Sequence, residues 1–404
     1  MLIVQKYGGT SLETPELLGR AAARIIKARR AGNQVVVVVS AMGHETDRLV
    51  KLAKGVCSQP SEREYDMLLS TGEQVSIALL AMALHDRGQP ATSFTGHQVR
   101  ITTDSSHTKA RIKEIDVERI YDRLTEGEVV IVAGFQGINL QGDITTLGRG
   151  GSDTTAVALA ASLKAGLCEI YTDVDGVYTA NPAIVKDARK IERISYDEML
   201  ELANLGASVL QPRAVEFACK YQVPLHVRCS FNENEGTMVV EENNNLEQVL
   251  VRGTSLKEDE AKITLDRVPD QPGSAGVIFS AVAEAGIEVD MIIQNIGADG
   301  FAKLSFTVPE NEADKTLEII SELDSRHGIS RAKIDKDIVK LSVVGVGMRS
   351  HCGVAAKMFR ALAHEGINLL MISTSEIAIS CVVEARYAEP GLRCLHQAFN
   401  LHNP

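Results

Sequence analysis

The chain has 404 residues, of which 45% are hydrophobic, and its formal net charge is −11 at neutral pH. This length predicts roughly two or three globular domains, and the negative charge argues against a nucleic-acid partner, which normally meets a basic surface. The seven cysteines show no CxxC spacing, the histidines show no ligand spacing, and no apolar run approaches membrane-spanning length. We therefore expect a cytoplasmic protein without disulfides, without a metal site of its own side chains and without membrane contact.

Strand and helix patterns alternate along the N-terminal part of the chain. Strands are expected at residues 1–7, 34–40, 129–133, 168–172 and 225–230, and helices at 15–31, 65–86, 156–163, 196–205 and 212–220. The five consecutive valines at 35–39 are typical of a strand that is buried on both faces. The alternation predicts an α/β fold with a mainly parallel sheet between helix layers. Ligands of such folds bind at the carboxyl ends of the strands.

The C-terminal part of the chain contains an internal repeat. A polar stretch at 241–245 marks a linker, and beyond it residues 273–292 align with 353–372 at nine identical positions in twenty. Each copy has an apolar strand (261–267 and 339–344), then a turn, a helix, a glycine and another strand. This order is the start of a βαββαβ unit. We expect domains at 1–245, 246–337 (a linker strand and the first copy) and 338–404 (the second copy).

Polar loops adjoin several of the predicted strands and helices. They are KYGGTS at 6–11, SAMG at 40–43, STGE at 70–73, TTLGRGGSDTTA at 145–156 and YTDVDGVY at 171–178. Glycine N–H groups and a lysine suit phosphate, whereas an arginine can bind carboxylate or phosphate with two parallel bonds. Each loop alone also suits a helix cap or an ordinary turn. The acids of the last loop lack the glycine and glutamate spacing of a calcium loop.

Taken together, these loops resemble one family. The motifs, in this order and spacing, are KYGGTS, VVVVVSAMG, STGE, VAGFQG, TTLGRGGSDTTAVALA and EIYTDVDGVYTANP. They resemble the aspartate kinases of the amino-acid kinase superfamily. The repeats, VPDQPG…AGIEVDMIIQN and GMRSHCG…EGINLLMISTSEIAIS, resemble the two regulatory ACT domains of that family. The resemblance covers essentially the whole chain and implies an amino-acid kinase fold followed by two βαββαβ ACT-like domains.

The resemblance also implies a reaction and the residues that perform it. ATP would phosphorylate the β-carboxylate of L-aspartate to 4-phospho-L-aspartate, the first step of the pathway to lysine, threonine and methionine. Lys6 matches the catalytic lysine that neutralises the transferring phosphoryl group, and Asp153 matches the aspartate that orients this lysine. Positions on the nucleotide side, besides Lys6, are Gly8, Gly9, Ser40, Thr172, Asp173 and Tyr178. Positions that bind the aspartate are Thr46, Glu73, Arg149, Gly150, Gly151 and Ser152.

Within this site, Arg149 would pair with the α-carboxylate of the substrate and Glu73 with its α-ammonium group. Mg²⁺ is expected to arrive with ATP, held mainly by phosphate oxygens and water. The sequence departs from many relatives at Ala183, where they have arginine, and at Ser208, where they have lysine. We expect the loss of these two basic side chains to weaken ATP binding.

Regulation is implied by the same resemblance. The effectors would be lysine, threonine or both, bound between paired ACT units. Matching positions are Asp270, Ala275, Glu288, Val289, Asp290 and Gln294 in the first copy and Val354, Asn368 and Glu376 in the second. The expected assembly is a homodimer through the ACT domains or a heterotetramer with a shorter ACT-only subunit.

Two alternatives stay open at this point. One is an amino-acid kinase of the glutamate or acetylglutamate type, against which Glu73, Arg149 and the ACT pair weigh. The other is a non-catalytic amino-acid sensor with the same fold, against which the presence of both Lys6 and Asp153 weighs.

Overall fold

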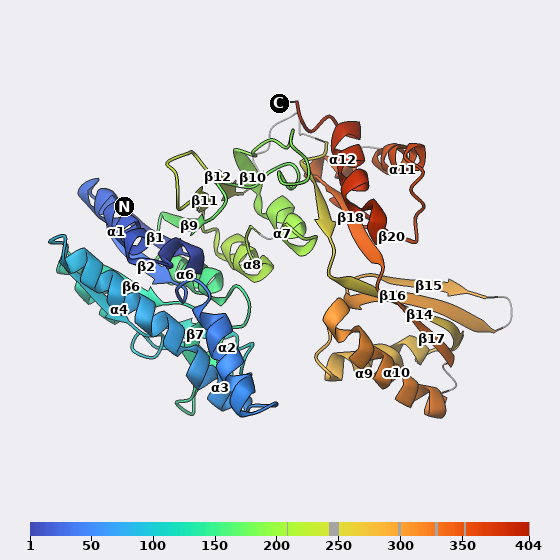
Figure 1. The fold of residues 1–404 in the computed structure, drawn as a ribbon, viewed down its shortest axis with the longest axis horizontal. Helices are drawn as coiled ribbons and strands as arrows, with labels where there is room; N and C mark the ends of the chain where they lie inside the picture. The colour runs from blue at the N-terminus through green and yellow to red at the C-terminus, as the bar shows by residue number, and fades with distance from the viewer. Residues whose placement is uncertain (208, 242–249, 298–299, 328–329, 351–352, 404) are drawn as a thin grey trace. The chain divides into compact units, whose positions relative to one another are not determined.

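The computed structural model describes residues 1–207, 209–241, 250–297, 300–327, 330–350 and 353–403. The chain divides into two compact units (Figure 1). The N-terminal unit comprises Met1–Val177, Lys190–Ala203 and Ser208–Asn245, and the C-terminal unit comprises Tyr178–Arg189, Asn204–Ala207 and Leu246–Pro404. The short segment 178–189 therefore belongs to the C-terminal unit, although the chain returns afterwards to the N-terminal one.

An eight-stranded sheet forms the centre of the N-terminal unit, in the order β10-β12-β11-β9-β1-β2-β6-β3. The strands are β1 Leu2–Tyr7, β2 Gln34–Val39, β3 Ala91–Phe94, β6 Val129–Ala133, β9 Leu167–Thr172, β10 Arg193–Ser195, β11 Leu225–Cys229 and β12 Thr237–Val240. All neighbours pair in parallel except β11 and β12. The predicted mainly parallel sheet is confirmed.

Helices cover both faces of this sheet. They are α1 Pro15–Arg30, α2 Glu45–Val56, α3 Glu62–Leu69, α4 Thr71–His85, α5 Glu118–Thr125, α6 Gly151–Ser162, α7 Tyr196–Asn204 and α8 Pro212–Tyr221, with a short 3-10 turn at Gly9–Leu12. Tyr7 and the alternate valines of β2 pack with α1 and α4 in one apolar core. Because side chains alternate across a strand, the neighbouring Lys6 points to the opposite face, where it meets α6.

The sequence analysis missed a second, small sheet in this unit. Its strands, in the order β5-β4-β7-β8, are β4 Ile101–Thr103, β5 Ile112–Ile115, β7 Gln136–Ile138 and β8 Ile144–Thr146. Each strand has only three or four residues, which is too short for a clear period-two pattern. This sheet matters because β8 leads directly into the glycine-rich turn at 147–150.

Two predicted helices have different bounds in the structure. The helix expected at 65–86 is two helices, α3 and α4, that meet at Ser70. The Ser70 hydroxyl donates to Met67 O at 2.9 Å, and the Ser70 carbonyl accepts a bond from the Gln136 side chain at 2.9 Å. The helix expected from 156 begins at Gly151, after Gly150 in a left-handed conformation (φ 67°). Ser152 and Asp153 therefore lie in the first helical turn rather than in a loop.

The stretch Glu62–His85 is the one segment, among the described residues, that is long and apolar enough to cross a membrane. Half of its most apolar window is buried within the protein. Several α4 residues belong to the core beneath the main sheet, which accounts for the composition of this helix.

The C-terminal unit contains two four-stranded antiparallel sheets, drawn from yellow to red in Figure 1. The first, in the order β15-β16-β14-β17, comprises β14 Glu260–Pro269, β15 Ile292–Ile296, β16 Phe301–Pro309 and β17 Ser330–Asp335, with helices α9 Ser274–Glu284 and α10 Ala313–His327. The second, in the order β13-β18-β20-β19, comprises β13 Gly253–Lys257, β18 Ile338–Val344, β19 Met371–Thr374 and β20 Ala378–Glu384, with α11 Val354–His364 and α12 Ala388–Ala398. Short 3-10 turns occupy Glu310–Glu312, Val346–Ser350 and Ala385–Tyr387.

The two repeats differ in whether their strands are continuous in the sequence. The first is a continuous βαββαβ unit from β14 to β17. In the second sheet, the edge position beside β18 is taken by β13, which precedes the first repeat in the sequence. The domain boundaries expected at 246 and 338 remain a prediction, because the second sheet uses residues from both sides of the first repeat.

Candidate active site

The loops identified in the sequence meet where parallel strands of the main sheet end. Lys6 aligns with Val38 on β2 and with Ile170 on β9. One residue beyond these strands, Gly8 N donates to Tyr171 O at 3.2 Å, and Ser40 N donates to Tyr7 O at 3.1 Å. Three loops that are far apart in the sequence thus lie side by side at one edge of the sheet.

An ion pair joins the end of β1 to the start of α6. Lys6 Nζ lies 2.7 Å from Asp153 Oδ1, and the two side chains are only 11% and 10% exposed. The pairing holds the ammonium group at the strand end instead of letting a flexible lysine sample solvent. A Cβ atom added to Gly8 would lie 3.5 Å from this Nζ, so the glycine leaves the ammonium uncrowded.

The glycine pair after β1 packs against the loop after β2. A Cβ atom on Gly9 would lie 2.6 Å from Ala41 O and 3.0 Å from Gly43 O, and Gly43 N donates to Gly9 O at 2.9 Å. Only glycine permits this backbone approach. Ser40, half-buried, precedes Ala41 in the same loop, and Thr46 lies half-buried in the first turn of α2.

Glu73 brings a buried carboxylate to this edge. It lies in the first turn of α4 and is 2% exposed, and its Oε1 accepts a bond from Ala41 N at 3.1 Å. Its Oε2 is buried and has no hydrogen-bond partner among the described residues. Burial raises the pKa of Glu73 to about 8. An unpartnered buried carboxylate oxygen suits a cationic donor such as a substrate ammonium group.

The turn between β8 and α6 presents Arg149 to solvent. Arg149 is exposed and has no ion-pair partner in the part of the chain that the structure describes. A Cβ atom on Gly151 would lie 2.9 Å from the Phe135 ring, so this turn packs on the short link between β6 and β7. Ser152 packs against Gly134, which follows β6. A Cβ atom on Gly134 would lie 2.7 Å from the Ser152 hydroxyl oxygen.

The expected nucleotide positions fall in both compact units of the chain. Thr172 is the last residue of β9, at the sheet edge that carries the site. Its hydroxyl donates to the carboxylate of Asp173, which is exposed. Tyr178 belongs to the C-terminal unit, as does the exposed Ala183. Ser208 lies outside the described residues. Among the described residues, no group of three or more His, Cys, Asp or Glu side chains could hold a metal ion.

Comparison with known proteins identifies the family. The model of the amino acid kinase family matches residues 1–229, and the ACT domain model matches residues 266–323 and 341–399. The chain is 54% identical over 404 residues to an aspartate kinase of Stutzerimonas stutzeri and 55% identical over 405 residues to an aspartokinase of Pseudomonas aeruginosa. Each alignment covers 100% of this chain and 98% of the relative. The chain belongs to the aspartokinase family.

Solved structures agree with this assignment. E. coli aspartokinase III in complex with aspartate and ADP matches with a TM-score of 0.85 at 26% identity, over 98% of this chain and 99% of that one. The same protein in complex with lysine and aspartate matches with a TM-score of 0.77. The predicted amino-acid kinase fold with C-terminal ACT domains is confirmed, and the chain is an enzyme, an ATP-using aspartate kinase.

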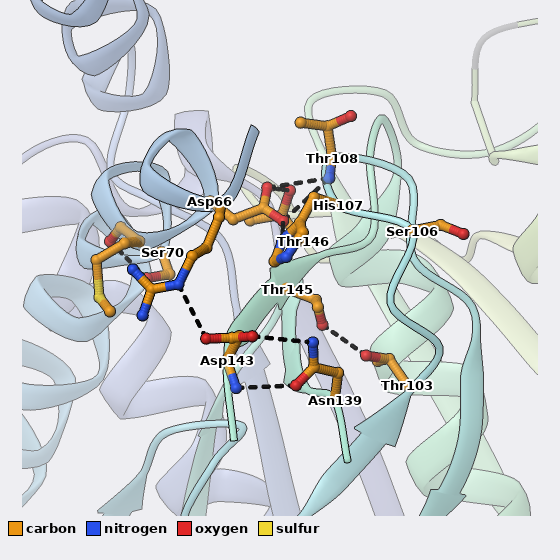
Figure 2. A network of polar contacts seen from close by, with 12 residues as sticks. Asp66, Ser70, Thr103, Ser106, His107, Thr108, Asn139, Asp143, Thr145 and Thr146 are labelled. Carbon is orange, nitrogen blue, oxygen red and sulfur yellow. Dashed lines mark hydrogen bonds and ion pairs between the residues drawn. The ribbon is translucent and has the colours of Figure 1, made fainter. Parts of the chain in front are cut away.

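The sequence analysis missed two charged residues, the half-buried Arg213 and the buried Asp66, that brace the Arg149 turn of this aspartokinase. Arg213, on α8, donates to Leu147 O at 2.9 Å and to Ala110 O at 2.7 Å. Asp66, on α3, is fully buried and accepts a bond from the Thr146 hydroxyl (Figure 2). The one signal for Asp66 was its spacing. It lies three residues before Leu69 and so shares the buried face of α3, where a carboxylate is rare.

The expected effector positions lie around the loops and edge strands of the ACT sheets. Asp270 follows β14, Gln294 lies on the edge strand β15, and Asn368 precedes β19. Asp290 is already paired, since Lys340 Nζ contacts its carboxylate and Lys257 Nζ lies 3.5 Å away. An effector ammonium group at Asp290 would therefore compete with two lysines of the chain itself.

The remaining expected effector positions of this aspartokinase lie in the helices beside the same two ACT sheets and in the loops next to their strands. They are Ala275 in the first turn of α9, Glu288 and Val289 before β15, Val354 at the start of α11, and Glu376 between β19 and β20. Of these, Val354 is buried, whereas Glu288 and Glu376 are exposed.

Proposed function

We propose that the enzyme transfers the γ-phosphoryl group of ATP to the β-carboxylate of L-aspartate, giving 4-phospho-L-aspartate at the start of the pathway to lysine, threonine and methionine. The observation that carries this proposal is the buried Oε2 of Glu73, which has no partner in the described part of the chain and lies at the same sheet edge as the Lys6–Asp153 pair. The first suits the ammonium group of an amino acid, and the second suits a phosphoryl group. A carboxylate with a pKa of about 3.9 is already ionised at neutral pH, so the acceptor needs no general base.

The acceptor would be held at both of its α-substituents. Glu73 would accept bonds from the α-ammonium group, and Arg149 would pair with the α-carboxylate through two parallel bonds. Ser152 and Thr46 would complete the pocket with hydroxyl groups, while Gly150 and Gly151 would let the backbone approach the substrate. Held in this way, the β-carboxylate is free to point at the phosphoryl group.

The main obstacle to the reaction is the approach of one anion to another. Positioning and positive charge should therefore provide most of the catalysis. Lys6, oriented by Asp153, would neutralise charge on the transferring group, and Gly8, Gly9 and Ser40 would line the phosphates. Further nucleotide contacts would come from Thr172, Asp173 and Tyr178.

Mg²⁺ would arrive with ATP and neutralise part of the phosphate charge. It would be coordinated mainly by phosphate oxygens and water, because Mg²⁺ gives up its water reluctantly and is usually bound through the phosphates of its nucleotide.

Feedback control would act through the ACT sheets, with lysine, threonine or both as effectors. The lysine complex of the structurally similar E. coli aspartokinase III supports this part of the proposal. Strand β15 is an edge strand whose Ile292 and Ile296 are 53% and 73% exposed. Such an edge suits pairing with another ACT sheet, in a homodimer or in a heterotetramer with a shorter ACT-only subunit.

The test is a coupled assay of ATP consumption with aspartate, glutamate and acetylglutamate as acceptors. Turnover is expected with aspartate, and hydroxylamine should trap the product as a hydroxamate because it attacks acyl phosphates. No turnover with aspartate at millimolar concentrations would refute the proposal, and faster turnover with glutamate or acetylglutamate would change the acceptor.

A further inference from the structure

Asp66 is a fully buried carboxylate to which the proposed reaction assigns no role. Burying a charge is costly unless hydrogen bonds replace the lost water. Figure 2 shows that two different segments supply these bonds, the loop with His107 and Thr108 and the end of strand β8 with Thr146. His107 Nδ1 donates to Oδ2 at 2.8 Å, and the Thr146 hydroxyl donates to Oδ1 at 2.5 Å. The Thr108 N–H faces both oxygens, at 3.1 and 3.0 Å.

Both segments support the turn that carries Arg149. Thr146 is the last residue of β8, three positions before Arg149. Thr108 has a left-handed backbone (φ 65°), which is strained for a residue other than glycine and persists where its surroundings hold it. A Cβ atom on Gly148 would lie 3.1 Å from Thr108 O, so the Thr108 turn packs directly on the residue before Arg149. Asp66 therefore anchors this turn from two directions.

The same residue is tied to the segment that carries Glu73. Asp66 O accepts a bond from Ser70 N at 3.0 Å, and Ser70 O accepts a bond from Gln136 Nε2 at 2.9 Å. Ser70 is the junction between α3 and α4, and Glu73 follows in the first turn of α4. One residue thus connects the two segments that present Arg149 and Glu73.

We infer that Asp66 is a positioning residue that holds the Arg149 turn in register with Glu73 and thereby sets the affinity for the acceptor amino acid. The inference rests on the proposed function, in which these two side chains bind the α-carboxylate and the α-ammonium group. Those groups are attached to one carbon atom, so a small shift of the turn weakens both charge-assisted interactions. The Lys6–Asp153 pair has no contact with Asp66 in the described network, so the ATP side should be spared.

The test compares Michaelis constants for the two substrates. Asp66→Asn should raise the KM for the acceptor by about tenfold or more, while the KM for ATP stays within about twofold of wild type. Thr146→Val, which removes a single bond, should raise the acceptor KM by about threefold. In an Arg149→Ala background, Asp66→Asn should add little, because the turn then has no guanidinium to position.

The matched control is Asp143→Asn. Asp143 also links α3 to the β7–β8 hairpin, since its carboxylate accepts a bond from Arg63 Nε at 2.9 Å. It is only partly buried, and it makes none of the hydrogen bonds described above that hold the Arg149 turn. Its replacement should leave both KM values unchanged.

Two results would overturn the inference. One is an unchanged acceptor KM in Asp66→Asn and Thr146→Val. The other is a parallel change of both KM values and kcat that follows a loss of Tm, since a purely structural role predicts that pattern. If Asp66→Asn does not fold, Thr146→Val decides the matter alone. The comparison uses whichever amino acid the wild type phosphorylates, so failure of the proposed acceptor and failure of this inference give different results.

Discussion

Binding of aspartate should release a proton from Glu73. Burial raises the pKa of this carboxyl from 4.5 to about 8, so at pH 7 about nine-tenths of the free enzyme carries a protonated Glu73. An ammonium group beside the carboxyl favours the ionised form and lowers that pKa. At pH 7 the complex should therefore form with the release of about 0.9 proton, and release should fall toward zero above pH 9.

The same linkage predicts how affinity depends on pH. Below pH 8 the carboxyl must first lose its proton, so the Kd for aspartate should rise by about tenfold for each unit of decreasing pH. Above pH 8 the Kd should level off. Replacing Glu73 by Gln should weaken binding and remove this dependence, because the amide does not titrate in this range.

Calorimetry in two buffers of different ionisation enthalpy measures the released proton directly. Arg149→Lys is the matched control, since it should weaken aspartate binding yet leave the proton release intact. The reasoning is refuted if wild type releases no proton at pH 7, or if Glu73→Gln releases as much as wild type does.

The remaining predictions concern stability, catalysis and control. Without aspartate, the raised pKa of Glu73 makes the free energy of unfolding fall by up to about 1.4 kcal/mol per pH unit between pH 4.5 and about 8, so Glu73→Gln should flatten this slope in chemical denaturation. Lys6→Ala should lower kcat by about 100-fold or more while the KM for aspartate changes little, and a change confined to KM would contradict the assigned role. Gly9→Ala should reduce both Tm and kcat because its Cβ would lie 2.6 Å from Ala41 O, whereas Gly55→Ala, with nothing within 4 Å, should do neither. Lysine and threonine, added singly and together, should slow the reaction, and unaltered rates in every mixture would argue against feedback control.

Much of the N-terminal fold was predictable because its signals are local. The valine run of β2 and the glycine pair after β1 indicate a buried strand and a close turn in any context. Strand ends that carry polar loops then imply a site at one edge of a parallel sheet, where the structure places Lys6, Ser40 and Thr172.

Other features had no local signal. At the junction of α3 and α4, Ser70 O accepts a bond from Gln136, which lies far along the chain. The small sheet that delivers the Arg149 turn consists of strands too short to show a period. The internal repeat predicted two copies of one unit, yet the second sheet takes its edge strand β13 from ahead of the first copy.

The sequence by itself determined the alternating elements, the duplicated C-terminal unit and the set of polar loops, because residue types and their spacing carry this information. Only the tertiary structure decided which of these groups meet and in what state. It left Glu73 Oε2 buried without a partner among the described residues, and it placed Asp66 between the two segments predicted to bind the acceptor. Burial and long-range hydrogen bonds produce these properties, and they arise from residues that become neighbours only when the chain has folded.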